Sequence, residues 1–271
     1  MSRRSLPLPR PAAAATIAAA ALPSVTPRYA RLDALRGFAV LWMALFHFAF
    51  DLNYFGLIEP RQSFQRDPFW TLQRSSIVSL FLFSAGLAQA VAMHHAQGGP
   101  RFSAAFWRRW MQVAGCALLV SAASAVMFPD TWIGFGVLHG IAVMLIAVRL
   151  AYPVRGWLWL LGALALALPW LLPLALRPQA FDTPWLSWLG LVTKKPRTED
   201  WVPLLPWLGV MFWGLAAGQW LLARERSLLT RGLPDALRPL ALLGRFSLSF
   251  YMLHQPVLIG ALAGGRAIGW W

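Results

Sequence analysis

The 271-residue chain has little charge and almost no cysteine. Only 13% of its residues are charged and 10 are acidic, against roughly a quarter charged in an ordinary soluble domain. The single cysteine, Cys116, excludes an internal disulfide framework and a cysteine-based metal cluster. P-loop and GxGxxG patterns are also lacking, so nothing supports a nucleotide-binding fold. These absences argue against an ordinary soluble enzyme and against a disulfide-stabilised secreted domain.

Apolar residues in long runs dominate the sequence instead. Hydrophobic residues make up 58% of the chain, with 16 Trp and 17 Phe, and the mean hydropathy is +0.55. The runs are continuous and rich in Leu and Ala, so they favour membrane-spanning helices of about 20 residues over alternating strands. We predict an all-α, polytopic transmembrane helix bundle of about seven spans: Ala34–Phe50, Ser75–Met93, Trp110–Met127, Trp132–Val148, Trp157–Leu176, Val202–Ala223 and Phe246–Ala263.

Basic and acidic residues are divided unevenly between the two sides of such a bundle. With the N-terminus inside, 16 of the 24 basic residues lie in inside segments and 7 of the 10 acidic residues lie outside. Because an excess of Lys and Arg marks cytoplasmic loops, we predict a cytoplasmic N-terminus. Topology therefore accounts for the net charge of +14, and no nucleic-acid partner is expected.

The chain divides into a tail and one membrane domain. Residues 1–30 are rich in Ala and Pro, and we expect a disordered cytoplasmic tail there, with a signal peptide as the alternative. Residues 31–271 are expected to form the transmembrane domain. No sequence repeat of the kind common in transporters is visible.

Polar side chains inside spans are costly in lipid, which makes them functional candidates. Three of the five histidines, His47, His139 and His254, lie in predicted spans. Asp51 follows His47 by four residues and shares its helix face, where a carboxylate can orient an imidazole for general-base catalysis. An interhelical hydrogen bond is the alternative for each histidine alone. We predict that these four residues are catalytic and surround a shared polar cavity. No metal site is expected, because no two histidines share a short spacing within a span.

Arginines gather at the predicted inner ends of the spans. We predict that Arg36, Arg108, Arg109 and Arg245 bind a phosphorylated ligand on the cytoplasmic face. The alternative is that they serve topology alone.

Four ordered motifs resemble one family. They are "RLDALRGFAVLWMALFHFAFDLNYFG", "FGVLHGIAVMLIA", "EDWVPLLPWLGVMFWGLAAG" and "GRFSLSFYMLHQPVL", and together they reach from Arg31 to Ile259. They resemble bacterial membrane proteins of the heparan-alpha-glucosaminide N-acetyltransferase catalytic-domain family, formerly a domain of unknown function. The resemblance implies a transmembrane acetyltransferase or acyltransferase of the bacterial inner (plasma) membrane. Acetyl-CoA would be its cytosolic co-substrate, and an amino sugar or other glycan on the outer face would be its acceptor.

The resemblance also bears on His47. By the pattern M-x-x-x-[NH], Met43 to His47, this histidine stands where the animal enzymes carry a functional asparagine. Those enzymes have a further histidine in the following outer loop, whereas none occurs here between Phe48 and Met93. Either His47 takes over that role, with Asp51 as its orienting partner, or the protein performs other chemistry.

The implied partners are membrane lipid, acetyl-CoA and the glycan acceptor, and a homo-oligomer is left open. Two other functions compete with the enzyme. Buried histidines with outer carboxylates also suit a proton-coupled transporter. A non-catalytic membrane partner in envelope-glycan assembly is the third alternative.

Overall fold

The computed structural model describes residues 29–96 and 99–270 of the chain. The tail predicted for residues 1–30 therefore lies almost wholly outside the described residues. The described part is helical and contains no strand, which confirms the predicted all-α class. The α-helices are α1 (Ala30–Tyr54), α2 (Pro68–His95), α3 (Ala104–Met127), α4 (Val137–Ala151), α5 (Trp157–Leu171), α6 (Leu204–Arg224), α7 (Arg226–Thr230), α8 (Arg238–Arg245) and α9 (Ser247–Ala267).

Each of the seven predicted spans overlaps one of these helices, but fewer than seven of the described helices are long enough to cross a membrane on their own. Within the described residues, five helices are long and apolar enough to cross a membrane, and the number rises to six if α9 and the segment before it form one bent span. That segment, Asp235–Arg245, meets α9 at an angle of 81°. The protein is thus an integral membrane protein with five or six candidate spans.

The predicted span that falls short is Trp157–Leu176, where the structure has α5, a helix of 15 residues. The helix ends at Leu171 because Leu172 is extended and precedes Pro173. A proline disfavours the helical conformation of the residue before it. Hydropathy alone gives no signal of this stop, since the apolar composition continues beyond it.

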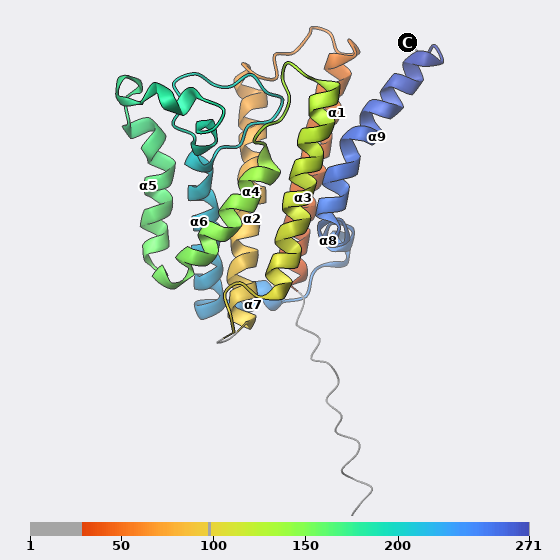
Figure 1. Ribbon diagram of the computed structural model, residues 1–271. Helices are drawn as coiled ribbons and strands as arrows, with labels where there is room; N and C mark the ends of the chain where they lie inside the picture. Colours follow the sequence, from red (N-terminus) through yellow and green to blue (C-terminus); the bar gives the residue numbers. More distant parts are fainter. Residues whose placement is uncertain (1–28, 97–98, 271) are drawn as a thin grey trace, which may run out of the picture.

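The helices pack into one bundle around an apolar core (Figure 1). Its centre is formed by helices α2, α4, α5 and α6, which contribute fully buried side chains: Leu82, Met144, Leu158, Met211 and Leu215. Helix α9 stands at one edge of the bundle and inclines away from the other helices toward its C-terminal end (Figure 1). It packs mainly on α1, and its contacts with α3 are few. The α1–α9 interface is therefore peripheral to the main core.

Helix α8 lies across the first turns of α1 and sets the position of the α8–α9 corner. A Cβ atom at Gly37 would overlap the carbonyl oxygen of Leu240, and one at Gly244 would overlap the carbonyl oxygen of Asp33. Only glycine permits this backbone approach from both sides. The contact fixes Arg245, the next residue, at the same end of the bundle as Arg36.

Candidate active site

Two pairs of polar side chains face each other across the α1–α9 interface. The first pair is His47 of α1 and His254 of α9, whose ring centroids lie 5.1 Å apart in an edge-to-face arrangement. His254 is buried, with 9% of its surface exposed, whereas His47 is half-buried. Two of the predicted site residues, 207 positions apart in the sequence, are thereby in contact.

The second pair is Asp51 and Gln255, one helical turn along α1 from the first. The Gln255 side-chain amide Nε2 donates to both carboxylate oxygens of Asp51, at 2.8 Å to Oδ1 and 3.1 Å to Oδ2. Asp51 is 2% exposed. The hydrogen-bond partner of Asp51 is therefore Gln255, and His47 makes no hydrogen bond with it among the described residues. Asp51 acts on α9 and does not orient His47 directly.

The hydrogen bond of His254 fixes its tautomer. Nδ1 lies 2.7 Å from the backbone carbonyl oxygen of Tyr251. Since a carbonyl oxygen only accepts, Nδ1 carries the proton and donates it, which leaves a lone pair on Nε2. That Nε2 is buried and has no hydrogen-bond partner among the described residues. A buried imidazole lone pair without a partner is the feature expected of a general base or a nucleophile.

His139 belongs to a different part of the bundle. Its Nδ1 accepts from the backbone N–H of Gly136 at 3.2 Å, and its Nε2 lies 3.2 Å from the Ser121 hydroxyl. That hydroxyl donates to the carbonyl oxygen of Ile133 at 2.6 Å, so it accepts from His139 Nε2–H. Both ring nitrogens are thus engaged in capping α4 and joining it to α3. The structure brings His47, Asp51 and His254 together and does not bring His139 to them through any described contact.

The acidic residues of the loop before α6 also have structural partners. Oδ2 of Asp200 accepts from the backbone N–H of Val137 at 2.6 Å, at the start of α4. Burial raises the pKa of the Asp200 carboxyl above its usual range. The hydroxyl of Thr193 donates a hydrogen bond that lowers the pKa of the exposed Asp182, and the backbone N–H of Thr193 adds a smaller effect in the same direction. These carboxylates hold the loop and the start of α4 in place.

Two of the four predicted phosphate-binding arginines line one groove. The groove has a volume of about 520 Å³ and lies at the end of the bundle where α1 begins. Its lining includes Arg109, Gln112 and Cys116 from α3, and Arg245, Met252 and Leu253 from the α8–α9 side. Arg109 and Arg245 are both exposed and make no ion pair within the described part of the chain. Such cations suit a phosphorylated ligand.

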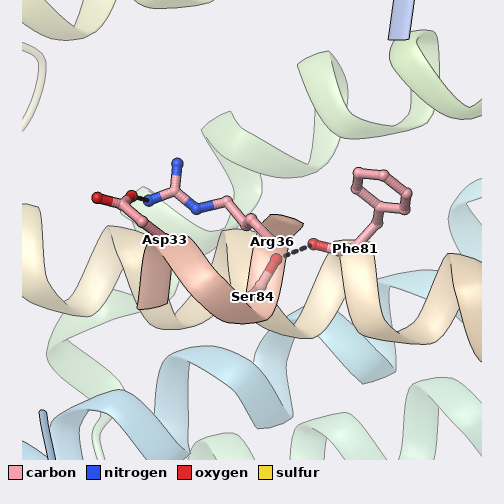
Figure 2. Close-up of polar contacts among 4 residues, drawn as sticks. All are labelled: Asp33, Arg36, Phe81 and Ser84. Carbon is pink, nitrogen blue, oxygen red and sulfur yellow. Dashed lines mark hydrogen bonds and ion pairs between the residues drawn. The ribbon is translucent and has the colours of Figure 1, made fainter. Parts of the chain in front are cut away.

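Arg36 and Arg108 behave differently from that pair. Arg36 Nη2 donates to Asp33 Oδ1 at 2.7 Å, as Figure 2 shows, and its Nε is buried without a partner among the described residues. Arg36 also lies near enough to Arg109 for the two charges to interact. Arg108 is exposed and is not part of the groove lining. The groove lining thus contains two of the four predicted arginines, with Arg36 close to Arg109 and Arg108 outside the lining.

The groove and the two polar pairs are adjacent along α9. Met252 and Leu253 line the groove, and His254 and Gln255 follow them directly in the helix. Pro256 lacks an N–H, which leaves the carbonyl of Met252 without its usual helical donor. His254 and Gln255 themselves do not line the groove and contact α1 instead.

Sequence analysis missed Gln255. An amide in the middle of an apolar helix is as costly in lipid as a lone histidine, and its place in "LHQP" was the available signal. Within residues 29–96 and 99–270, no three His, Cys, Asp or Glu side chains lie together as metal ligands would.

Comparison with known proteins gives one match. The family model described as "Heparan-alpha-glucosaminide N-acetyltransferase, catalytic" matches residues 28–256, which is most of the chain and includes both polar pairs. No curated protein and no solved structure gives a match. The chain belongs to the heparan-alpha-glucosaminide N-acetyltransferase catalytic-domain family.

Proposed function

We propose that this protein is a bacterial inner-membrane acetyltransferase. It takes the acetyl group from cytosolic acetyl-CoA and passes it to an amino sugar or another glycan acceptor at the outer face. The observation that supports this proposal above all is the free, buried Nε2 of His254 beside His47. The family name supports the type of reaction.

The groove supports acetyl-CoA as the donor. Its arginines lie where α1 begins, the end that the charge distribution assigns to the cytoplasm. The phosphates of acetyl-CoA would bind Arg109 and Arg245, with Arg36 adding charge behind them. The thioester would then extend along α9 to the histidine pair. His254 lies seven positions beyond Ser247, the first residue of α9, which is a rise of about 10 Å at 1.5 Å per residue.

The proposed transfer uses His254 as the base. The acceptor nitrogen attacks the thioester carbonyl carbon, the carbon–sulfur bond breaks, and CoA leaves as the thiolate. His254 Nε2 takes a proton from the acceptor nitrogen and passes it to the departing sulfur. His47 lies at the edge of His254, half-buried, where its ring can contact the thioester. An acetyl group carried transiently on an imidazole would split the same reaction into two steps.

The test mixes purified protein in detergent with acetyl-CoA labelled in its acetyl group. We expect the wild type to consume acetyl-CoA in the presence of an amino sugar, and His254→Ala and His47→Ala to lose that turnover while remaining folded. His94→Ala is the matched control, since His94 lies in the last turn of α2 and contacts His95, away from both polar pairs. Label retained on the wild-type protein would identify an acetylated intermediate, and its absence would identify direct transfer.

Absence of both acetyl-CoA binding and consumption would overturn the enzyme proposal. The transporter function would then be tested in proteoliposomes, where solute or protons would move without acetyl-CoA. Size-exclusion chromatography of the same preparation measures whether the chain forms a homo-oligomer.

A further inference from the structure

The orientation of the Gln255 amide is determined by its partner. The Nε2 amide of Gln255 donates to both oxygens of Asp51, at 2.8 Å and 3.1 Å, and an ionised carboxylate only accepts hydrogen bonds. The NH₂ group therefore faces Asp51 in this structure. This leaves Oε1 turned away from Asp51, and Oε1 is buried without a partner in the described part of the chain.

Two unpartnered acceptors thus lie on consecutive residues of α9. One is Oε1 of Gln255, and the other is the lone pair on Nε2 of His254. Both side chains contact α1, His254 through His47 and Gln255 through Asp51. A buried acceptor without a donor is destabilising, so the pair is suited to a ligand that brings donors. A primary amine brings two N–H groups in one atom, whereas a hydroxyl brings a single O–H.

We infer that Gln255 is the specificity-determining residue for the acceptor. Its Oε1 and His254 Nε2 together receive the two N–H groups of a primary amine. Asp51 is the positioning residue, because it holds the amide so that Oε1, and not NH₂, faces the ligand. If the acetyl group goes to a hydroxyl, its single O–H leaves either Oε1 or Nε2 without a hydrogen-bond donor. A site left with such an unpaired buried polar group rejects that ligand. This inference rests on the proposed acetyltransferase function.

The test measures the ratio of two rates of acetyl transfer, to glucosamine and to glucose, with labelled acetyl-CoA. These sugars differ in one amine against one hydroxyl. We expect Gln255→Leu to lower the amine-to-hydroxyl ratio of kcat/KM at least about tenfold, by reducing the rate with glucosamine. Gln219→Leu is the matched control. It removes an amide that donates to the Tyr152 carbonyl at 2.8 Å on another face of the bundle, and it should leave the ratio unchanged.

Asp51→Asn covers the case in which Gln255→Leu does not fold. The two amides still hydrogen bond to each other, yet Gln255 is free to flip and present NH₂ to the ligand. We expect the ratio to fall in this variant as well. Loss of stability alone would lower both rates together and leave the ratio constant.

The outcomes separate the inference from the function that it rests on. An unchanged ratio in both Asp51→Asn and Gln255→Leu, with turnover present, overturns the inference and leaves the acetyltransferase standing. A wild type that does not bind or consume acetyl-CoA overturns both.

Discussion

Replacing Arg109 by Gln should weaken CoA binding, and the same change at Arg108 should not. Arg109 lines the groove beside Arg245 and has no ion-pair partner among the described residues, so its guanidinium is available for a phosphate. Hydrogen bonds to a charged group are each worth about 1.5–3 kcal/mol. Losing one such contact should raise the Kd for CoA by roughly 10- to 150-fold.

Arg108 is the matched control because it is the adjacent residue of α3, exposed, and outside the groove. Both variants remove one positive charge from the same end of the bundle, so a general electrostatic effect would weaken binding equally in both. Only a specific phosphate contact distinguishes them. The effect of Arg109→Gln should also fall as salt rises, since ions screen exposed charges.

The assay is isothermal titration calorimetry in detergent with acetyl-CoA and with acetyl-pantetheine, which lacks the nucleotide phosphates. We expect Arg109→Gln to weaken binding of acetyl-CoA and to leave the weaker binding of acetyl-pantetheine unchanged. Equal losses in Arg108→Gln and Arg109→Gln would refute the assignment of the groove. An unchanged Kd in Arg109→Gln would refute it as well.

Three further predictions concern the fold and its orientation. Asp200→Ala should destabilise the protein by about 1–3 kcal/mol in thermal unfolding, because the N–H of residue 137 loses its buried acceptor, whereas Asp200→Asn keeps an acceptor and should cost much less. Burial raises the pKa of Asp200 above its ordinary value of about 3.9. At pH values between the ordinary pKa and the raised pKa of the folded state, the folded protein keeps a proton that the unfolded chain has lost. Asp200 therefore makes the stability fall as pH rises through this range, and Asp200→Asn should remove this pH dependence. Gly244→Leu should separate α8 from α1, because the added side chain meets backbone atoms that cannot move aside. We expect it to abolish CoA binding and to lower the stability by at least about 1–3 kcal/mol. Retained binding would show that the α8–α9 corner does not position the groove. In a Cys116→Ser background, an impermeant maleimide should label Asp130→Cys on intact cells and Arg101→Cys only after the membrane is opened, and the reverse pattern would invert the predicted topology.

The candidate site was predictable in its members and not in its pairings. His47 and His254 were identified because each is a polar group in an apolar span, and Asp51 because it follows His47 by four residues on the same helix face. The partner of Asp51 was predicted as His47, four residues away on the same helix, and the structure gives Gln255 instead. Spacing on a helix shows which side chains share a face, but it cannot show which donor a neighbouring helix brings to that face.

For His139 as well, the sequence did not show which groups surround the ring. As a histidine in an apolar segment it met the same criterion as His254, yet its two nitrogens are both engaged at the start of α4. The distinction depends on whether donors and acceptors surround the ring, and those come from Ser121 and from the turn before α4. The sequence showed that burying this imidazole is costly, but it did not show the hydrogen-bond partners that offset the cost.

The sequence by itself determined that this chain is a helical membrane protein, where its helices lie, and which polar side chains are costly there. These properties follow from hydropathy over about 20 consecutive residues, which is local information. Only the tertiary structure decided the 81° corner before α9 and the contact between α1 and α9. That contact joins Asp51 to a residue 204 positions away. Such pairings depend on how close two backbones approach and which faces they turn to each other, and glycines such as Gly37 and Gly244 acquire their role only when the partner helix is in place.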